Sequence, residues 1–407
     1  MKLQCKVAWM VAKMASQVPN EQNYFFDENL IRPLVSLLVF ETMDRNTHKT
    51  LRTSNTMHSV VRSGVALTGS SDMEGKLGKS EMKTMKSLNG RPVQDSWDTY
   101  SAYSQFYFDG KWDGLCRSPE HIFTQETKTK KIRHLRGFSD SFSFHVPSNL
   151  ELLKRVRESE DPETKRDLKF QVTSALCNLA KDNVEISRKI TETKALICLA
   201  QMIEKEVGDV QKIAILAVME IASAAERDAE LRRFAFKMNS RAAKAVLHQL
   251  LRIIENGSDD LKVPCVKTIG CLARTFPAKE TKVIEILVHE LGNSEYCVAL
   301  EASVSLQKFV HQSNFLHVEH SKTILDAGSI HHLMHLISLD GKEVQLPSLT
   351  LLCYLAEHLP SHDVFMEMET LKTLKAVSHT HVAQLQSARE DLIMAIQQLE
   401  LYQSGGH

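Results

Sequence analysis

The sequence predicts an all-α fold, a right-handed superhelical solenoid of repeated helices with one long irregular insertion. Three observations predict it. Hydrophobic residues make up 43% of the chain and aromatic residues only 6%, which favours a helical core of Leu, Ile, Val and Ala over a β-sandwich. A 13-residue amphipathic segment recurs six times, and further apolar helical segments lie between copies. Such units cannot bury their apolar faces alone, so they stack into one continuous core.

The six copies align without gaps. They read LQCKVAWMVAKMA from Leu3, LKFQVTSALCNLA from Leu168, VQKIAILAVMEIA from Val210, LKVPCVKTIGCLA from Leu261, VALEASVSLQKFV from Val298 and VQLPSLTLLCYLA from Val344. Columns five, nine and twelve form an i, i+4, i+7 stripe, which is predicted to be the buried face of a helix. Pro264 and Pro347 occupy column four, which places them in the first helical turn, where a missing N–H does little harm.

The spacing of the copies identifies the type of repeat. From Leu168 onward the copies start 42, 51, 37 and 46 residues apart, around the ~40–47 residues of armadillo and HEAT units. Additional helices are predicted between the copies, at residues 30–40, 194–205, 242–255, 281–291 and 329–339. The sequence therefore predicts an armadillo-repeat solenoid whose recurring segment is the third, inner helix of each unit.

The first copy begins almost at Met1, with no polar capping repeat before it. We expect an exposed solenoid edge there, left by missing upstream repeats or covered by another chain. The first two copies start 165 residues apart, and residues between them show no repeat. The predicted organisation is a partial set of N-terminal repeats over 1–61, an insertion over 62–148 and a solenoid of about five repeats over 149–407.

The insertion has an unusual composition. It begins with the linker-like SGVALTGSSDMEGKLGKS and continues with the aromatic YSAYSQFYFDGKWDGL and the basic KTKKIRHLRG. It is too aromatic for an ordinary disordered loop. Two alternatives stay open, a peptide-binding or membrane-touching insert and an artefact of gene assignment.

Composition and motifs argue against several functions. Lys+Arg and Asp+Glu both number 50, so no global field indicates nucleic-acid binding, and no apolar run reaches the ~18 residues of a membrane span. The eight cysteines contain no C-x-x-C pair, which is typical of buried thiols in a reducing compartment. Gly78-Lys79-Ser80 lacks the glycine of a phosphate loop, and His331 with His335 lacks a third metal ligand. No enzyme activity, cofactor or metal is predicted.

Columns seven and eleven lie one turn apart and are expected to point into the concave groove of the solenoid. The candidate protein-binding residues in these columns are Trp9, Lys13, Ser174, Asn178, Glu220, Lys267, Lys308, Thr350 and Tyr354. Nuclear-import adaptors repeat Trp-x-x-x-Asn here, with tryptophans flanking lysine stems and asparagines binding the peptide backbone. Only Trp9 and Asn178 match that pattern, in different repeats. A groove for basic peptides of that kind is therefore disfavoured.

The chain also resembles a known family. Residues 190–288, together with QCKVAWMVAKMA, NLIRPLVSLLVFET, FLHVEHSKTILDAGSIHHL, VQLPSLTLLCYLAEHLP and LELYQSGGH, are similar to the armadillo-repeat-only proteins of plants. The similarity covers residues 1–60 and 150–407. In this family further armadillo repeats precede the first segment, and the aromatic run at 97–115 departs from the family pattern.

The resemblance implies a non-enzymatic scaffold in polarised tip growth. Its implied partners are Rho-of-plants GTPases or their GTPase-activating regulators, and its implied location is the cytoplasm, with recruitment to the plasma membrane and a nuclear location left open. The alternative is an armadillo-type substrate adaptor of a ubiquitin ligase or of transport. The ligase would need a U-box, which the sequence does not show, and the transport adaptor is weakened by the missing Trp/Asn pattern.

Overall fold

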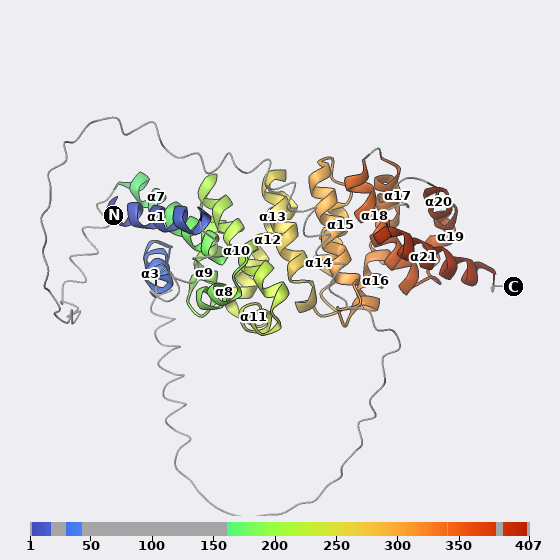
Figure 1. The fold of residues 1–407 in the computed structure, drawn as a ribbon, viewed down its shortest axis with the longest axis horizontal. Coiled ribbons are helices and arrows are strands. Elements are labelled where there is room, and N and C mark those ends of the chain that lie inside the picture. Colours follow the sequence, from blue (N-terminus) through green and yellow to red (C-terminus); the bar gives the residue numbers. More distant parts are fainter. Residues whose placement is uncertain (1, 18–29, 43–160, 340, 380–385, 405–407) are drawn as a thin grey trace, which may run out of the picture. The chain divides into compact units, whose positions relative to one another are not determined.

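The fold is described from a computed structural model, which covers residues 2–17, 30–42, 161–339, 341–379 and 386–404 (Figure 1). These residues form α-helices joined by turns and one 3-10 helix, and none of them lies in a strand. The described segments before and after residues 43–160 belong to one compact unit. The predicted armadillo-type helical solenoid is therefore confirmed for the part of the chain that the structure describes.

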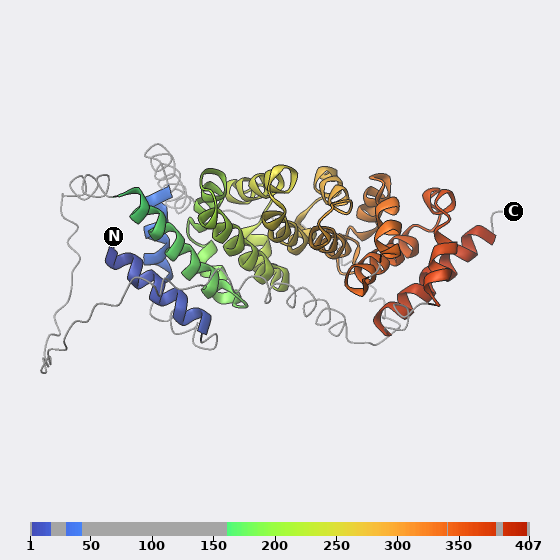
Figure 2. The ribbon, with the colours of Figure 1, turned by 90° about the horizontal axis from the view of Figure 1, so that it is seen from above.

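One series of helices runs through this unit, each packing on the next along the chain (Figures 1 and 2). We call them the ladder helices. They are α1 (Lys2–Gln17), α7 (Pro162–Ala180), α10 (Asp209–Arg227), α13 (Asp259–Cys271), α15 (Tyr296–Val310), α18 (Lys342–His358) and α21 (Gln386–Ser404). All six predicted copies lie on ladder helices, and α21 is a seventh that the repeat alignment missed.

The remaining helices pack beside the ladder helices and complete the repeats. They are α3 (Ile31–Thr42), α8 (Val184–Thr191), α9 (Ala195–Lys205), α11 (Ala229–Ala235), α12 (Arg241–Asn256), the 3-10 helix η2 (Ala273–Thr275), α14 (Thr281–Glu290), α16 (His317–Asp326), α17 (Ser329–Ser338), α19 (Val364–Glu367) and α20 (Thr370–Val377). The predicted helices at 30–40, 194–205, 242–255, 281–291 and 329–339 correspond to α3, α9, α12, α14 and α17. Between α13 and α15 the three-residue η2 and α14 take the place of two α-helices, which explains the short spacing of 37 residues there.

Several of these helices have a side chain that caps their N-terminus. Asn183 accepts a hydrogen bond from the backbone N–H of Ile186 at 3.0 Å and so caps α8. Ser240 caps α12 in the same way through the N–H of Ala243, also at 3.0 Å. Each cap satisfies one of the backbone donors that a helix N-terminus leaves without an internal partner. The connections before α8 and α12 therefore end at defined residues.

Two details of the predicted copies are wrong. Pro264 and Pro347 lie beyond the first turn, because α13 already begins at Asp259 and α18 at Lys342. Each proline removes one internal hydrogen bond from its helix. The fourth copy also does not stay α-helical to its end, since the chain tightens at Leu272 into the 3-10 helix η2.

The long interruption of the chain falls inside a repeat. Helix α3 packs on α7, so these two helices act as the second and third helices of one unit, although residues 43–161 separate them in sequence. The predicted domain boundaries at 61/62 and 148/149, the linker-like, aromatic and basic runs, and Gly78-Lys79-Ser80 lie outside the described residues. They therefore remain predictions.

The first ladder helix buries only one of its two packing sides. Ala8, Val11, Ala12 and Ala15 are buried against α7, whereas Val7 and Met14, in columns five and twelve, are about half exposed. The prediction that these two columns are buried is therefore wrong for α1. They are buried in the later copies because a preceding ladder helix covers them there.

A glycine-to-alanine change tests how closely the ladder helices approach. A methyl group on Gly270 of α13 would lie 2.8 Å from Cβ and 2.9 Å from Cα of Ser305 on α15. We expect Gly270→Ala to lower the free energy of unfolding by about 1–2 kcal/mol, because overpacking outweighs the gain in helix propensity. Urea unfolding followed by circular dichroism measures the change. The double variant Gly270→Ala/Ser305→Gly should recover part of the loss, whereas stabilisation by Gly270→Ala alone would contradict this packing.

Candidate protein-binding face

Columns seven and eleven form a partly exposed strip between buried columns. On α7, Ser174 and Asn178 are half-buried, whereas Thr173, Ala175 and Cys177 around them are buried. Glu220, Lys267, Lys308 and Tyr354 of later ladder helices are also half-buried, and Trp9 and Lys13 of α1 are exposed. Leu216 and Val304 of column seven are half-buried and complete the set. We call these ten residues the ladder face.

One predicted member is not accessible. Thr350 is only 1% exposed, because α15, α17 and α21 all pack on its helix α18. It is therefore excluded from the ladder face. Cys271, the column-eleven residue of α13, is likewise buried, and burial raises the pKa of its thiol to about 12.

The first members of the ladder face contact each other. The Lys13 ammonium lies 5.1 Å from the centre of the Trp9 ring, a cation–π contact on the surface of α1. The Asn178 side chain on α7 donates a hydrogen bond to the backbone carbonyl of Ala12 at 3.0 Å. Asn178 therefore holds a backbone group of its own chain, where the import-adaptor hypothesis expected it to hold a peptide.

An ion pair crosses the middle of the ladder. Lys308 on α15 lies 2.8 Å from the carboxylate of Glu226 on α10, and its ammonium also lies 3.6 Å from Sγ of Cys271 on α13. Burial alone would raise the pKa of Glu226, but the charge and hydrogen bond of Lys308 bring it below its usual value. The pKa of Lys308 is raised although burial opposes this, because Cys271, Glu226 and Glu301 favour its charged form. The pair thus joins three consecutive ladder helices.

Two further carboxylates surround this pair. Burial raises the pKa of Glu220 and of Glu301, and in both cases Lys267 is the main opposing charge. Lys308 also lowers the pKa of Glu301. The centre of the ladder face is therefore a mixed set of carboxylates and ammonium groups that largely neutralise each other. Such a set favours neither a strongly basic nor a strongly acidic ligand.

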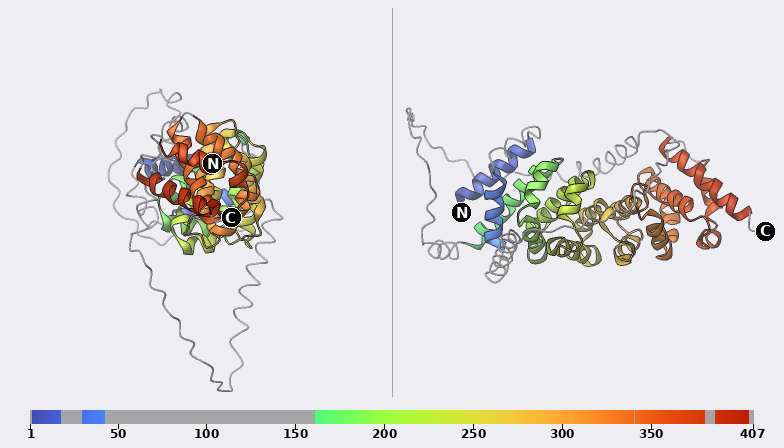
Figure 3. Two further views of the ribbon diagram at one scale, coloured as in Figure 1. Left: turned by 90° about the vertical axis from the view of Figure 1, so that its right-hand side faces the viewer. Right: turned by 90° about the horizontal axis from the view of Figure 1, so that it is seen from below.

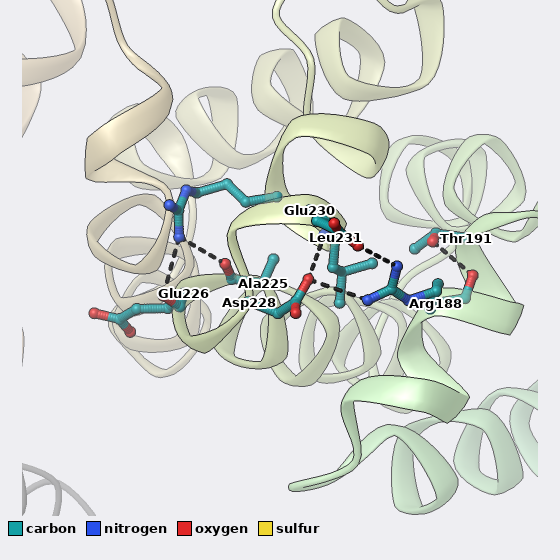
Figure 4. Close-up of polar contacts among 8 residues, drawn as sticks. Arg188, Thr191, Ala225, Glu226, Asp228, Glu230 and Leu231 are labelled. Atoms are coloured by element: carbon teal, nitrogen blue, oxygen red, sulfur yellow. Dashed lines mark hydrogen bonds and ion pairs between the residues drawn. The ribbon is translucent and has the colours of Figure 1, made fainter.

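The end of α10 is held so that Glu226 meets Lys308. The guanidinium of Arg232 donates to the backbone carbonyls of Ala225 and Glu226, each at 3.0 Å (Figure 4). These bonds satisfy carbonyl groups that a helix C-terminus leaves free. In the same close-up Asp228 caps α11 and accepts a hydrogen bond from Arg188 of α8 at 3.4 Å (Figure 4). Outer and ladder helices of two repeats are thus fixed together at this point.

Histidines cluster at the other end of the ladder face. Tyr354 stacks on His358 with ring centres 6.3 Å apart, and His358 meets His317 edge to face at 4.8 Å. The Ser321 hydroxyl lies 2.9 Å from Nδ1 of His358. Burial, together with the charges that His317 and His311 would carry, lowers the pKa of His358 to about 4. The His358 ring is therefore packed as a neutral group at neutral pH.

The described residues hold neither a group of side chains suited to a metal ion nor a helix suited to span a membrane. No three His, Cys, Asp or Glu side chains there gather as a metal site would require, and His331 contacts His332 through their rings at 5.8 Å. None of the described helices combines the length and apolar character needed to cross a bilayer.

Sequence reasoning missed Glu226 and His358. Glu226 is four residues beyond the end of the aligned copy, and its partner Lys308 is 82 residues away. His358 lies two residues beyond its copy, so the column analysis stopped before it. Extending the alignment by one helical turn would have included both residues, although it would not have paired them.

Comparisons with known proteins find similarity at a low level only. No protein-family model and no curated protein matches the sequence. Similar solved structures include a designed armadillo repeat protein with a TM-score of 0.48 and 17% identity, covering 60% of this chain and 98% of that chain. A second, in complex with the peptide (KR)4, has a TM-score of 0.47 and 17% identity, covering 61% and 99%. Computationally designed armadillo repeat proteins for modular peptide recognition give 0.48 and 16%, covering 61% and 98%. These values carry no argument on function.

Removing the lysine of the central ion pair should destabilise the fold. Lys308→Met leaves Glu226 without its ammonium partner, and we expect the free energy of unfolding to fall by about 2–4 kcal/mol. The double variant Lys308→Met/Glu226→Gln should recover most of this loss. Lys372→Met removes an ammonium from an exposed pair and serves as the control, with a change below about 1 kcal/mol. Equal effects of the two single variants in urea unfolding would show that the central pair has no special role.

Acid should weaken the fold through the histidine cluster. The pKa of His358 is lowered from 6.5 to about 4 in the folded chain, so the folded state binds fewer protons than the unfolded state between these values. The contribution of His358 to the free energy of unfolding is therefore complete above pH 6.5, and it is lost as the pH falls towards 4. We expect roughly 1–2 kcal/mol of stability to disappear between pH 7 and pH 5. His358→Gln should flatten this part of the profile, and an unchanged slope would contradict the assignment.

Proposed function

We propose that the chain is a non-enzymatic scaffold that binds a polypeptide segment of its partner along the ladder face. The observation that carries the proposal is the repeated strip of partly exposed side chains, held at fixed spacing between buried columns of consecutive ladder helices. A rigid series of equivalent positions suits an extended polypeptide segment, because each ladder helix in turn can contact the next part of that segment.

The chemistry of the strip indicates the kind of segment. Leu216, Val304, Trp9 and Tyr354 offer apolar or aromatic contact area, whereas the charged centre is balanced by its own ion pairs. We therefore propose a ligand of mixed character, anchored by apolar side chains, in place of a polybasic or polyacidic peptide. The few aromatic positions are the expected main contributors to affinity.

We further propose the partner class that the resemblance to plant armadillo-repeat-only proteins implies. In this proposal the scaffold brings a Rho-of-plants GTPase together with its GTPase-activating regulator at the cell cortex during tip growth. Joining both on one chain would raise their effective concentration for each other. An adaptor of a ubiquitin ligase or of transport is the alternative, and it too would bind its target through the ladder face.

The test compares two valines. The full chain is titrated by calorimetry with a purified Rho-of-plants GTPase and, separately, with a GTPase-activating regulator. Val304→Arg places a bulky charge on the ladder face and should weaken binding by about tenfold or more. Val318→Arg makes the same change at a 40% exposed position of α16 and should leave binding unchanged.

The outcomes separate the two parts of the proposal. If neither protein binds the unmodified chain, the signalling role is wrong. If one binds and both variants bind it equally well, the role stands but the ladder face is not the site.

A further inference from the structure

We propose that the chain associates head to tail with copies of itself, the outer side of α21 in one copy packing on the outer side of α1 in the next. The proposal is independent of the partner class proposed above. It rests on the two end helices of the ladder, each of which has a ladder neighbour on one side only among the described residues (Figure 3).

Helix α1 exposes the side that every later copy buries. The exposed apolar residues on this side are Leu3 at 75%, Val7 at 50%, Met10 at 53% and Met14 at 45%, in columns one, five, eight and twelve. Columns five, eight and twelve are buried in all five later copies. They face the preceding ladder helix, as the hydrogen bond from Ser305 in column eight to the carbonyl of Val266 on α13 shows. The apolar stripe on α1 therefore has the surface chemistry that receives a preceding ladder helix.

Helix α21 exposes the opposite side. Its buried residues Ala388, Leu392, Ala395 and Leu399 have the same 4-3-4 spacing as columns one, five, eight and twelve. This alignment places Ile393, Gln397 and Glu400 in columns six, ten and thirteen, and all three are exposed. In the six earlier copies these columns are buried. They face the following ladder helix, as the bond from Gln307 in column ten to the carbonyl of Pro347 on α18 shows.

Charge favours contact between α1 and α21 over contact between two α1 helices. Helix α1 carries Lys2, Lys6 and Lys13 and no acidic residue, whereas α21 carries three acidic residues and one arginine. One of these acidic residues, Glu400, already pairs with Lys375 of α20 at 2.7 Å, so the charge difference between the two helices is partly reduced. Two α1 helices packed together would bring like charges into contact, whereas α1 against α21 brings opposite charges together.

The contact would be weak, and it would not limit the assembly to a fixed number of copies. The exposed side of α21 mixes Ile393 and the neighbouring Met394 with Gln397 and Glu400, so it buries less apolar area than an internal ladder contact. Because the two sides differ, each pair of copies would keep one free α1 and one free α21. Such heterologous contacts produce chains of variable length that grow with concentration.

Sedimentation velocity on the full chain tests the proposal. The weight-average sedimentation coefficient should rise with protein concentration, and it should rise less at high salt, which screens the charges. Val7→Glu and Ile393→Glu should each give monomers, while Val318→Glu, at an exposed position of α16, should behave as the unmodified chain. Circular dichroism and urea unfolding establish that each variant is folded.

Mixing the two monomeric variants distinguishes the modes of contact. The Val7→Glu chain keeps an intact α21 and the Ile393→Glu chain keeps an intact α1, so an equimolar mixture should form one-to-one dimers and nothing larger. An unmodified chain that stays monomeric at all soluble concentrations would overturn the proposal, including the case in which another segment of the same chain covers α1. Self-association of Ile393→Glu at the unmodified level would also overturn it, in favour of a symmetrical α1 contact.

Discussion

The structure depends on close contact between successive ladder helices through small side chains. Columns five, eight and twelve of each helix meet columns six, ten and thirteen of the helix before it. Column twelve holds large apolar residues, whereas the other columns of this contact are rich in Ala, Ser, Cys, Thr and Gly. Small side chains let two helix backbones approach, as at Gly270 and Ser305. Because this contact uses both flanks of a ladder helix, only columns seven and eleven keep partial access to solvent within columns five to thirteen of the later copies. The candidate binding face is thus a direct result of how the repeats pack.

Polar groups inside this packing are joined across helices. Ser303 and Ser348 lie 3.2 Å apart, Gln307 donates to the carbonyl of Pro347 at 2.7 Å, and Lys308 reaches over α13 to α10. A buried polar group costs free energy when it has no partner, so each of these contacts exists in one alignment of the helices and is lost in a shifted one. Small apolar residues alone would allow neighbouring ladder helices to slide along each other. The polar contacts therefore favour a single register.

Much of the fold could be predicted from the sequence, because a stacked repeat depends on local periodicity. The six copies and the outer helices α3, α9, α12, α14 and α17 follow from apolar spacing alone. Helix α21 escaped detection because Gln397 and Glu400 replace the small residues that columns ten and thirteen usually hold. The candidate site was predicted less well. Most residues of columns seven and eleven are partly exposed, and their role in binding stays a prediction. Spacing alone cannot show that Asn178 and Lys308 contact other repeats of their own chain.

The placement of residues 43–161 between α3 and α7 affects how the chain can be assembled. Helices α8 to α21 form contacts among residues close in sequence, whereas α3 can meet α7 only after a long loop closes. Loop-closure entropy grows only slowly with length, so the cost falls mainly on the rate at which this repeat forms. The contact between α3 and α7 does not itself require an unbroken chain through residues 43–161. Two separately expressed pieces, one ending after α3 and one beginning before α7, hold all the surfaces needed to recombine, which makes this repeat a natural place to divide or extend the protein.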